Sequence, residues 1–328
     1  NIIMKLGKLT TDELNKNVIS LLHKNRSEVL LSSAIGEDCA ALDLKDVIVV
    51  SSDPITAVVE KEKLGALCVS VCCNDVAANG GEPVAMTITL IMPPSSSAED
   101  VGIIMRGAVK RADELNVDIV GGHTEFSDCV VRPVACGTAF GKTGKLISKA
   151  GLKQNDLLYV TKKLALEGTC ILADILKPEL DKTEKDKLAL FNSQLDVLPE
   201  SMLLRSSSEV SMMHDVTEGG ILGAVAEVCF LRQTGAEIYE DKMPFDPLTL
   251  KLCARAGVDP LRLISSGSML VAVSDPEKAE KAMNTANIEF TCIAKVTGKD
   301  VVLVRKDGTR EKIDVLADEM YKFSGESK

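Results

Sequence analysis

The sequence has few aromatic residues and an excess of negative charge. It contains no Trp, three Tyr and seven Phe, so aromatic residues make up only 3% of its 328 residues. The 48 acidic residues outnumber the 38 basic ones and leave a net charge of −10. Base stacking needs aromatic rings, and phosphate-backbone binding needs clustered Lys and Arg, so we expect no nucleic-acid partner. No apolar run approaches the roughly 20 residues of a membrane-spanning helix, and we expect no membrane partner.

Histidine and cysteine give no clear metal site. The three histidines, His23, His123 and His214, are too few and too scattered for a zinc centre. The ten cysteines show no regular framework, and the N-terminal segment has too short an apolar run for an export signal. We therefore expect reduced thiols and a cytoplasmic protein. Cys68 and Cys72 lie four residues apart on a predicted helix and could bind a soft metal, although Cys is more commonly a small core residue.

The length and composition favour a globular chain of two domains. Hydrophobic residues make up 45% of the chain and charged residues 26%. Polar and Gly residues interrupt the pattern near 148–155, which predicts domains at 1–150 and 151–328. Strands and helices alternate in both, which is typical of the α/β and α+β classes. The expected helices are 11–24, 61–78, 98–115, 164–176, 219–231 and 276–286, with a final one at 317–323; the expected strands are 47–50, 84–92, 117–120, 130–140, 157–161, 209–213, 269–274 and 290–296, followed by a hairpin at Asp307-Gly308.

Acidic residues with Gly or small neighbours gather at the ends of the predicted elements. Loops at strand ends are where α/β proteins place ligands, and a carboxylate there can hold Mg²⁺ and, through it, phosphates. A single Asp beside Gly is more often a turn or a helix cap, so spacing alone leaves both interpretations open. The segments are 36–41, 51–53, 74–78 with Gly80 and Gly81, and 214–220.

The segment 137–143, Gly-Thr-Ala-Phe-Gly-Lys-Thr, is superficially like a P-loop. It has three residues between its glycines where a Walker A loop has four, and Gly144 and Lys145 follow where a P-loop needs a helix. We therefore interpret this segment as the end of a strand and not as a phosphate-binding loop.

Taken in chain order, six motifs resemble those of the aminoimidazole-ribonucleotide (AIR) synthase superfamily. The most specific is Asn74-Asp75-Val76-Ala77-Ala78 with Gly80, Gly81 and Pro83, which is similar to the family's Asn-Asp-hydrophobic-Ala-Ala-x-Gly-Ala-x-Pro. The other five resemble Gly-x-Asp-x-Ala at 36–40, a Thr/Ser-x-Asp strand end at Ser52-Asp53, Gly-Gly-(Asp/Glu)-Thr at 121–124, Asp-x-Thr-x-Gly-Gly at 215–220 and Ser-Gly-x-Leu at 266–270.

The resemblance implies a PurM-like architecture. Its first domain is an α/β domain whose strands pair across a two-fold axis to form a homodimer barrel. Its second domain is α+β with a ferredoxin-like core. ATP is implied between the two domains, with Mg²⁺ held by acidic residues. Most enzymes of the family activate an oxygen of a small-molecule substrate with the γ-phosphoryl group of ATP, so metal ions spread the charge and the protein mainly positions groups.

The resemblance also implies the site residues of this chain. The implied metal ligands are Asp38, Asp53, Asp75 and Asp215. The implied catalytic residues are Asp75, His123 and Asp215. The implied nucleotide-binding residues are Gly36, Asp38, Ser52, Asn74, Gly121, Gly122, Thr124, Thr217, Gly219 and Gly220.

One position departs from the family pattern. His123 stands where relatives carry Asp or Glu, and neutral imidazole is a poor ligand for Mg²⁺. Three alternatives follow: Glu125 takes over the ligand role, one metal is lost, or His123 contacts a phosphate or acts as an acid near neutral pH.

The motif style is closest to that of the hydrogenase-maturation protein HypE. That protein uses a Cys on a C-terminal tail, whereas the last Cys here is Cys292, inside a predicted strand. We therefore expect this chain not to perform the HypE reaction. The leading hypothesis is an ATP-dependent enzyme of unassigned substrate, favoured by the retained acidic residues. The alternative is a non-catalytic ATP-binding homodimer with a regulatory or scaffold role, favoured by His123 and the different C-terminus.

Overall fold

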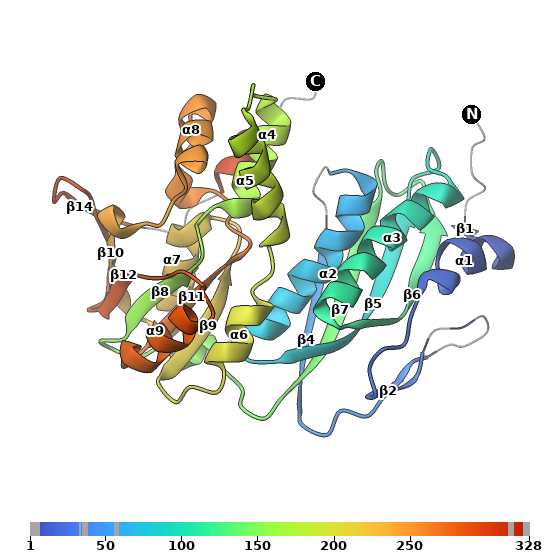
Figure 1. The fold of residues 1–328 in the computed structure, drawn as a ribbon, viewed down its shortest axis with the longest axis horizontal. Coiled ribbons are helices and arrows are strands. Elements are labelled where there is room, and N and C mark those ends of the chain that lie inside the picture. The colour runs from blue at the N-terminus through green and yellow to red at the C-terminus, as the bar shows by residue number, and fades with distance from the viewer. Residues whose placement is uncertain (1–6, 33, 35–38, 56–58, 314–317, 324–328) are drawn as a thin grey trace. The chain divides into compact units, whose positions relative to one another are not determined.

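The computed structural model describes residues 7–32, 34, 39–55, 59–313 and 318–323. The chain divides into two compact units (Figure 1). Unit 1 contains Asn1–Ala77 and Gly81–Gly144, and unit 2 contains Ala78–Gly80 and Lys145–Lys328. Both units mix helices with a β-sheet, which confirms the expected α/β and α+β classes. None of the helices in the described ranges combines the length and the apolar character needed to cross a bilayer.

Unit 1 is built on a five-stranded sheet with the order β1-β6-β5-β7-β4. Only β5 and β6 run parallel; the other neighbours are antiparallel. A separate two-stranded pair joins β2 to β3. The bounds are β1 Gly7–Lys8, α1 Thr11–Asn17, η1 Ile19–Leu21, β2 Val29–Leu31, β3 Ala41–Leu42, β4 Val47–Ile55, α2 Lys61–Ala78, β5 Glu82–Met92, α3 Ala98–Leu115, β6 Asp118–Phe126 and β7 Val134–Thr143.

The sequence determines α2 and α3 by different signals, and both have the predicted bounds. Helix α3 begins with a capping box between Ser97 and Asp100 and ends at Asn116, which adopts the left-handed conformation common at helix ends. Helix α2 is apolar over much of its length, and its thiols Cys68 and Cys72 are fully buried. The core interpretation of these cysteines is thereby confirmed.

Helices α2 and α3 approach each other closely through two glycines. A Cβ atom on Gly65 of α2 would lie 1.9 Å from the carbonyl oxygen of Ile104, and one on Gly107 of α3 would lie 1.9 Å from that of Glu62. Real Cβ atoms never come so near, so only glycine allows the two backbones to meet here. Gly within a helix costs up to about 1 kcal/mol relative to Ala, and the close packing offsets this cost.

Two strands of unit 1 differ from the sequence-based expectation. The strand expected at 117–120 continues to Phe126, so the motif at 121–125 lies inside β6 and not in a loop. This continuation depends on Gly122, whose φ is 151° and whose absent Cβ would lie 1.9 Å from the Ile88 carbonyl oxygen of β5. The strand expected at 130–140 begins only at Val134, and Val131 is 93% exposed in the preceding turn. The segment 137–143 lies in β7, which confirms that it is part of a strand.

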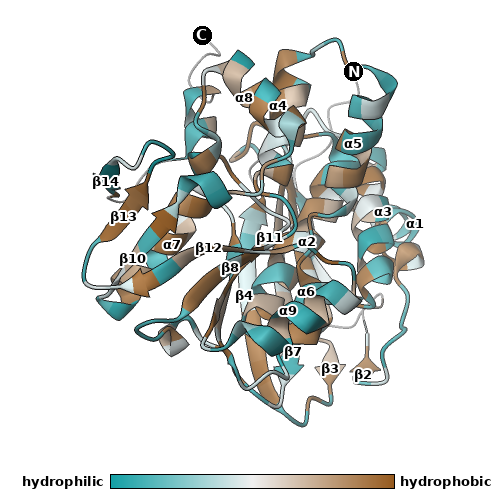
Figure 2. Cartoon of the chain, turned by 60° about the vertical axis from the view of Figure 1, so that its left-hand side comes forward, coloured by the Kyte–Doolittle hydropathy of each residue, from teal (hydrophilic) through white to brown (hydrophobic). Residues whose placement is uncertain are grey.

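Unit 2 is built on a seven-stranded sheet with the order β14-β13-β10-β12-β8-β11-β9. Helix α7 packs through an apolar core against the face that carries Leu158 and Val160 of β8. The next residue, Tyr159, points to the opposite face, where its hydroxyl donates to Glu280 of α9 at 2.6 Å. Helices therefore cover both faces (Figure 2). The bounds are η2 Lys149–Gly151, β8 Leu157–Thr161, α4 Leu166–Leu176, α5 Lys182–Ser193, α6 Leu198–Leu204, β9 Val210–Val216, α7 Gly220–Arg232, β10 Gly235–Tyr239, η3 Glu240–Lys242, α8 Pro247–Ala256, η4 Pro260–Arg262, β11 Ser268–Val273, α9 Pro276–Thr285, β12 Phe290–Thr297, β13 Val301–Val304, β14 Arg310–Lys312 and η5 Glu319–Phe323.

Several elements of unit 2 have no signal that the sequence analysis detected. Helix α5 lies in a charged part of the sequence where no helix was expected; its capping box joins Asp181 to Glu184, and Phe191 is its buried residue. Strand β10 and helices α6 and α8 were not expected. The final helix expected at 317–323 is a 3-10 turn, η5, within the described residues.

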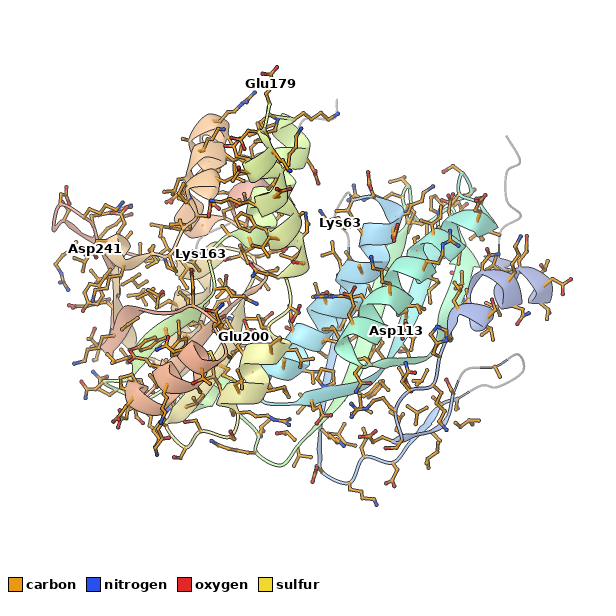
Figure 3. The ribbon with its side chains drawn as sticks, viewed as in Figure 1. Lys63, Asp113, Lys163, Glu179, Glu200 and Asp241 are labelled. Carbon is orange, nitrogen blue, oxygen red and sulfur yellow. The ribbon has the colours of Figure 1, made fainter. Side chains whose placement is uncertain are left out.

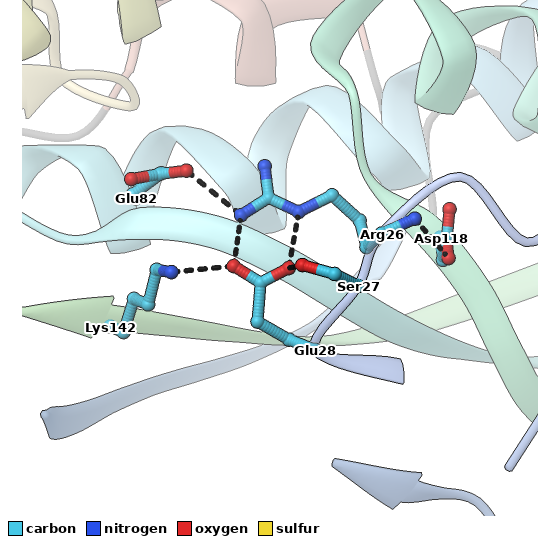
Figure 4. A network of polar contacts seen from close by, with 6 residues as sticks. All are labelled: Arg26, Ser27, Glu28, Glu82, Asp118 and Lys142. Atoms are coloured by element: carbon cyan, nitrogen blue, oxygen red, sulfur yellow. Dashed lines mark hydrogen bonds and ion pairs between the residues drawn. The ribbon is translucent and has the colours of Figure 1, made fainter. Parts of the chain in front are cut away.

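A network of charges fixes the segment before β2 to the sheet of unit 1 (Figure 4). The Arg26 Nη2 lies 2.8 Å from Oε1 of Glu28 and 2.8 Å from Oε1 of Glu82, and Lys142 Nζ lies 2.5 Å from Glu28 Oε1. The buried Asp118 carboxylate accepts hydrogen bonds from the backbone N–H of Arg26 and of the residue before it. The hydrogen bond from Lys142 lowers the pKa of Glu28 to about 2, against the opposing effect of burial.

We expect the Gly107→Ala variant to be destabilised by about 1–3 kcal/mol, because the added methyl group forces α2 and α3 apart. Helix propensity alone would predict a gain from the same change. Urea unfolding of the purified variant measures the difference. Gly144→Ala is the matched control, because a Cβ at Gly144 has no atom within 4 Å. Equal stability of Gly107→Ala and wild type would contradict the close helix contact.

We expect Glu28→Gln to lower the free energy of unfolding at pH 7 by roughly 2 kcal/mol, because Arg26 and Lys142 lose a charged hydrogen-bond partner. The folded pKa of Glu28 lies below its usual value of 4.5, so its stabilisation is complete above pH 4.5 and is lost as the pH falls toward 2. The difference between variant and wild type should therefore shrink between pH 4.5 and 2. Urea unfolding at several pH values tests this, with the exposed Glu60→Gln as control. A difference in unfolding free energy that does not change with pH would show that Glu28 does not contribute to the loss of stability in acid.

Candidate functional site

Two carboxylates of the family motifs meet in unit 1. Strand β4 carries Ser51 and Asp53 on one face, because alternate side chains of a strand share a face, and helix α2 carries Asp75. The Ser51 Oγ lies 2.5 Å from Asp75 Oδ2 and 3.0 Å from Asp53 Oδ2. A hydroxyl has one hydrogen to donate, so the two carboxylates share a single donor.

The surroundings of this carboxylate pair are electronegative. Asp53 forms no ion pair with any described Lys or Arg. Burial raises the pKa of the neighbouring Cys72 thiol to about 12, and the negative charges of Asp53 and Asp75 add to the rise, while a hydrogen bond from the Asp53 backbone opposes it. Adjacent carboxylate oxygens are the ligands that a hard divalent cation such as Mg²⁺ prefers. The donor set therefore fits Mg²⁺.

Other predicted site residues lie near Asp53 and Asp75 in the sequence, but their side chains point in different directions. Asn74 is buried, with 3% of its surface exposed. Ser52 points to the opposite face of β4, where its hydroxyl donates to the carbonyl of Gly137 and lies 2.8 Å from the hydroxyl oxygen of Thr138. Ser52 is therefore not brought together with Asp53 and Asp75.

Strand register separates His123 from the carboxylate pair. Asp53 pairs with Gly137 of β7, Gly137 pairs with Ile88 of β5, and Ile88 pairs with Gly122 of β6. Three strand spacings of about 4.8 Å put Asp53 and Gly122 about 14 Å apart. His123, next to Gly122, points to the face opposite α2, so within one chain it does not join Asp53.

His123 has an acidic partner on its own strand. Its Nε2 lies 3.1 Å from Oε2 of Glu125, and the two side chains are 42% and 39% exposed. Gly121 lies on the same face as this pair, whereas Thr124 points to the other face and is 9% exposed. Glu125 therefore interacts with His123 and is not placed beside Asp53 or Asp75.

Part of the predicted metal and nucleotide site lies outside the described residues. This holds for Gly36 and Asp38. Over residues 7–32, 34, 39–55, 59–313 and 318–323, no group of three or more His, Cys, Asp or Glu side chains is arranged to hold a metal ion. The described part of the candidate metal site in unit 1 is thus the pair Asp53 and Asp75.

Unit 2 contains the second group of predicted residues. Asp215 is 5% exposed in β9, and the adjacent His214 is 7% exposed. The His214 Nε2 lies 3.2 Å from Oε2 of Glu227 on α7, and its Nδ1 lies 3.7 Å from Asp215 Oδ1. Burial alone would raise the pKa of Asp215, but His214 and the charge of Lys149 hold it below the usual value. Asp215 is therefore held in its ionised form.

The loop 217–219 follows Asp215 and leads directly into α7. Gly219 and Gly220 both have positive φ, 77° and 60°. A Cβ on Gly220 would lie 2.7 Å from the Leu261 carbonyl oxygen, so the start of α7 fits tightly against the segment before β11. The carbonyl of Thr217 accepts from the backbone N–H of Ser265 at 3.2 Å. Asp318 also contacts this loop: it accepts a hydrogen bond from Gly219 N–H, and no motif in the sequence marks it.

Comparison with known families covers most of the chain. The family described as AIR synthase related protein, N-terminal domain, matches residues 36–143, and the one described as AIR synthase related protein, C-terminal domain, matches residues 153–306. The chain belongs to the AIR synthase related family. Both matches include motif residues discussed above, Asp53 and Asp75 in the first and Asp215 in the second.

Individual relatives in this family share about a quarter of their residues with the chain. A putative hydrogenase expression/formation protein of Methanocaldococcus jannaschii is 28% identical over 222 residues, which cover 67% of this chain and 64% of that protein. The carbamoyl dehydratase HypE of Rhodobacter capsulatus is 27% identical over 227 residues, covering 66% and 63%. The matched stretch therefore spans slightly less than two thirds of the length of these curated relatives.

The fold is shared with a solved member of the family. The crystal structure of the hydrogenase maturation protein HypE in complex with ATP aligns with a TM-score of 0.79. The alignment covers 94% of this chain and 95% of that chain at 17% sequence identity. This likeness establishes the PurM-like fold expected from the motifs.

Proposed function

We propose that the chain is an ATP- and Mg²⁺-dependent enzyme that activates an oxygen of a small substrate by phosphoryl transfer. The observation that carries this proposal is the pair Asp53 and Asp75, which share the Ser51 hydroxyl at the most specific family motif. The name of one relative, carbamoyl dehydratase, and the ATP complex of the HypE structure support ATP chemistry on this fold. The substrate is unassigned.

We assign the residues of this chain the following roles. Asp53 and Asp75 would hold Mg²⁺, which when bound neutralises phosphate charge. Ser51 keeps the two carboxylates side by side in the absence of the ion. Gly219 and Gly220 open the 13-residue helix α7, and the N-terminal end of a helix favours a phosphate group; their own N–H groups donate to Asp318 and to the Thr217 carbonyl, so these two glycines shape the loop. His214, whose Nδ1 lies 3.7 Å from Asp215 Oδ1, lowers the pKa of the Asp215 carboxyl.

Asp75→Asn should weaken Mg²⁺–ATP binding by roughly 10–100-fold, because one anionic ligand of the metal becomes neutral. Titration calorimetry of the full chain with ATP and Mg²⁺ measures the affinity. Asp46→Asn is the matched control, since Asp46 is exposed in the loop before β4. An unchanged affinity in Asp75→Asn would exclude Asp75 from the nucleotide site.

The non-catalytic alternative makes a different prediction for the same purified chain. Release of ADP from Mg²⁺–ATP with any member of a panel of purine-pathway, thiamine and carbamoyl substrates would support the enzyme hypothesis. Tight ATP binding with no ADP release under any substrate would favour a regulatory or scaffold protein instead.

We further propose that unit 1 forms a homodimer through the sheet face opposite α2. Ile48 and Val50 of β4 are each 53% exposed on that face, beside Ser52 and Thr138. An apolar sheet face of this kind calls for a partner surface, and isologous dimers are the commonest solution. Val130 and Val131 precede β7 and do not contribute to this face, whereas Val134 begins the strand.

Val50→Lys should convert a dimer to a monomer, because it places a charge in the middle of the apolar surface. Light scattering at micromolar concentration gives the mass of each protein. Val131→Lys is the control, since Val131 is 93% exposed in a turn and outside the strand. A wild-type chain of monomeric mass would refute the dimer.

A further inference from the structure

The C-terminal turn η5 of unit 2 contacts the loop that joins β9 to α7. Asp318 is 6% exposed, and its Oδ2 accepts a hydrogen bond of 2.7 Å from the backbone N–H of Gly219. Its Oδ1 accepts from the backbone N–H of Met320 at 2.8 Å. One carboxylate thus caps the turn and attaches it to the family motif.

Neighbouring side chains strengthen this attachment. The Tyr321 hydroxyl donates to Oε2 of Glu218 at 2.9 Å. Glu319 is 4% exposed, accepts from the backbone N–H of Asp259 at 3.3 Å and lies 3.5 Å from Nη1 of Arg262. The turn therefore contacts both the motif loop and the segment around η4, against which the start of α7 packs.

The motif loop needs support from outside itself. Consecutive glycines at 219 and 220 have more conformational freedom than other residues, so their backbone is fixed only by its contacts. On one side the Thr217 carbonyl accepts from Ser265 N–H, and on the other side Asp318 accepts from Gly219 N–H. An ionised carboxylate can accept at both oxygens, as Asp318 does, whereas an Asn side chain offers one acceptor and one donor.

We infer that residues 318–323 brace the loop 217–220 in the conformation that binds ATP, with Asp318 as the positioning residue. This inference rests on the proposed function, because it adds a positioning residue to the same nucleotide site. Burial raises the pKa of Asp318, while the hydrogen bonds from Met320 N–H and Gly219 N–H oppose that rise.

The test uses the full chain with Asp318→Ala and Asp318→Asn. We expect the dissociation constant and the KM for Mg²⁺–ATP to rise roughly 10-fold, as is typical for residues that orient a binding group, with a smaller change in kcat. Hydrogen exchange at Gly219 and in the first turn of α7 should become faster in the same variants. Tyr321→Phe should change the ATP dissociation constant and the exchange rate in the same direction by smaller amounts. This variant provides the test if the Asp318 variants do not fold.

Asp307→Ala is the matched control. Asp307 also accepts a backbone hydrogen bond, from Thr309 N–H at 2.9 Å, but it lies in the exposed turn between β13 and β14. Unchanged ATP affinity in a folded Asp318→Ala would overturn the brace, and so would tighter binding, which would mean that the Asp318 carboxylate occupies a phosphate position. A wild-type chain that binds no ATP would instead defeat the proposed function. In that case unchanged exchange at Gly219 would separately show that Asp318 does not hold the loop.

Discussion

The close approach of helix α2 is the constraint on which unit 1 depends. Glycine makes it possible on both sides of the helix. Gly65 and Gly107 let α2 meet α3, and a Cβ on Gly137 of β7 would lie 2.8 Å from the Cys72 sulfur and 2.9 Å from that of Cys68. Because the cysteine side chains are small and Gly137 has no side chain, α2 packs closely against the sheet. Only at this distance can Ser51 of β4 contact Asp75 of α2 (Figure 3 shows the side chains of this region around α2).

This packing explains how two like charges persist side by side. Nearby carboxylates repel each other, and burial makes the repulsion stronger. Ser51 lies between the two carboxylates and its hydroxyl hydrogen offsets part of this repulsion. Elsewhere in the same unit, Arg26 and Lys142 contact the carboxylate of Glu28 and balance its charge. Asp53 and Asp75 belong to the family motifs, whereas Glu28 does not, and this difference is the reason to propose binding at the first cluster and stability at the second.

Local signals determined how much of the structure could be predicted. The bounds of α2, α3 and β8 follow from apolar spacing, acidic residues in a first helical turn and a short apolar run after a polar boundary, and the structure has the same bounds. The motifs likewise identified Asp53 and Asp75, which the structure brings together. Helix α5 was missed because it is polar on most of its surface and has one buried residue, so tertiary contacts and its capping box decide its conformation.

Other features of the site depend on tertiary contacts that a single sequence does not display. A glycine pair normally suggests a loop, yet β6 continues through Gly121 and Gly122 because β5 pairs with it along its length. Asp318 was missed because its contact with Gly219 spans 99 residues and has no local pattern. Contacts of this range depend on how unit 2 folds as a whole.

The position of His123 shows how strand geometry limits the assignment of catalytic roles. Its motif suggests a neighbour of the metal, but β6 directs it to the face opposite Asp53, with two strands between β6 and β4. The same face carries Ser52 and the exposed Ile48 and Val50. If this face pairs with a second copy of the chain, His123 and Glu125 belong to that interface. Any catalytic role of His123 would then be exerted at the interface with the second copy. The departure from the family's acidic residue is then a property of the assembly and leaves the carboxylate pair of each chain intact.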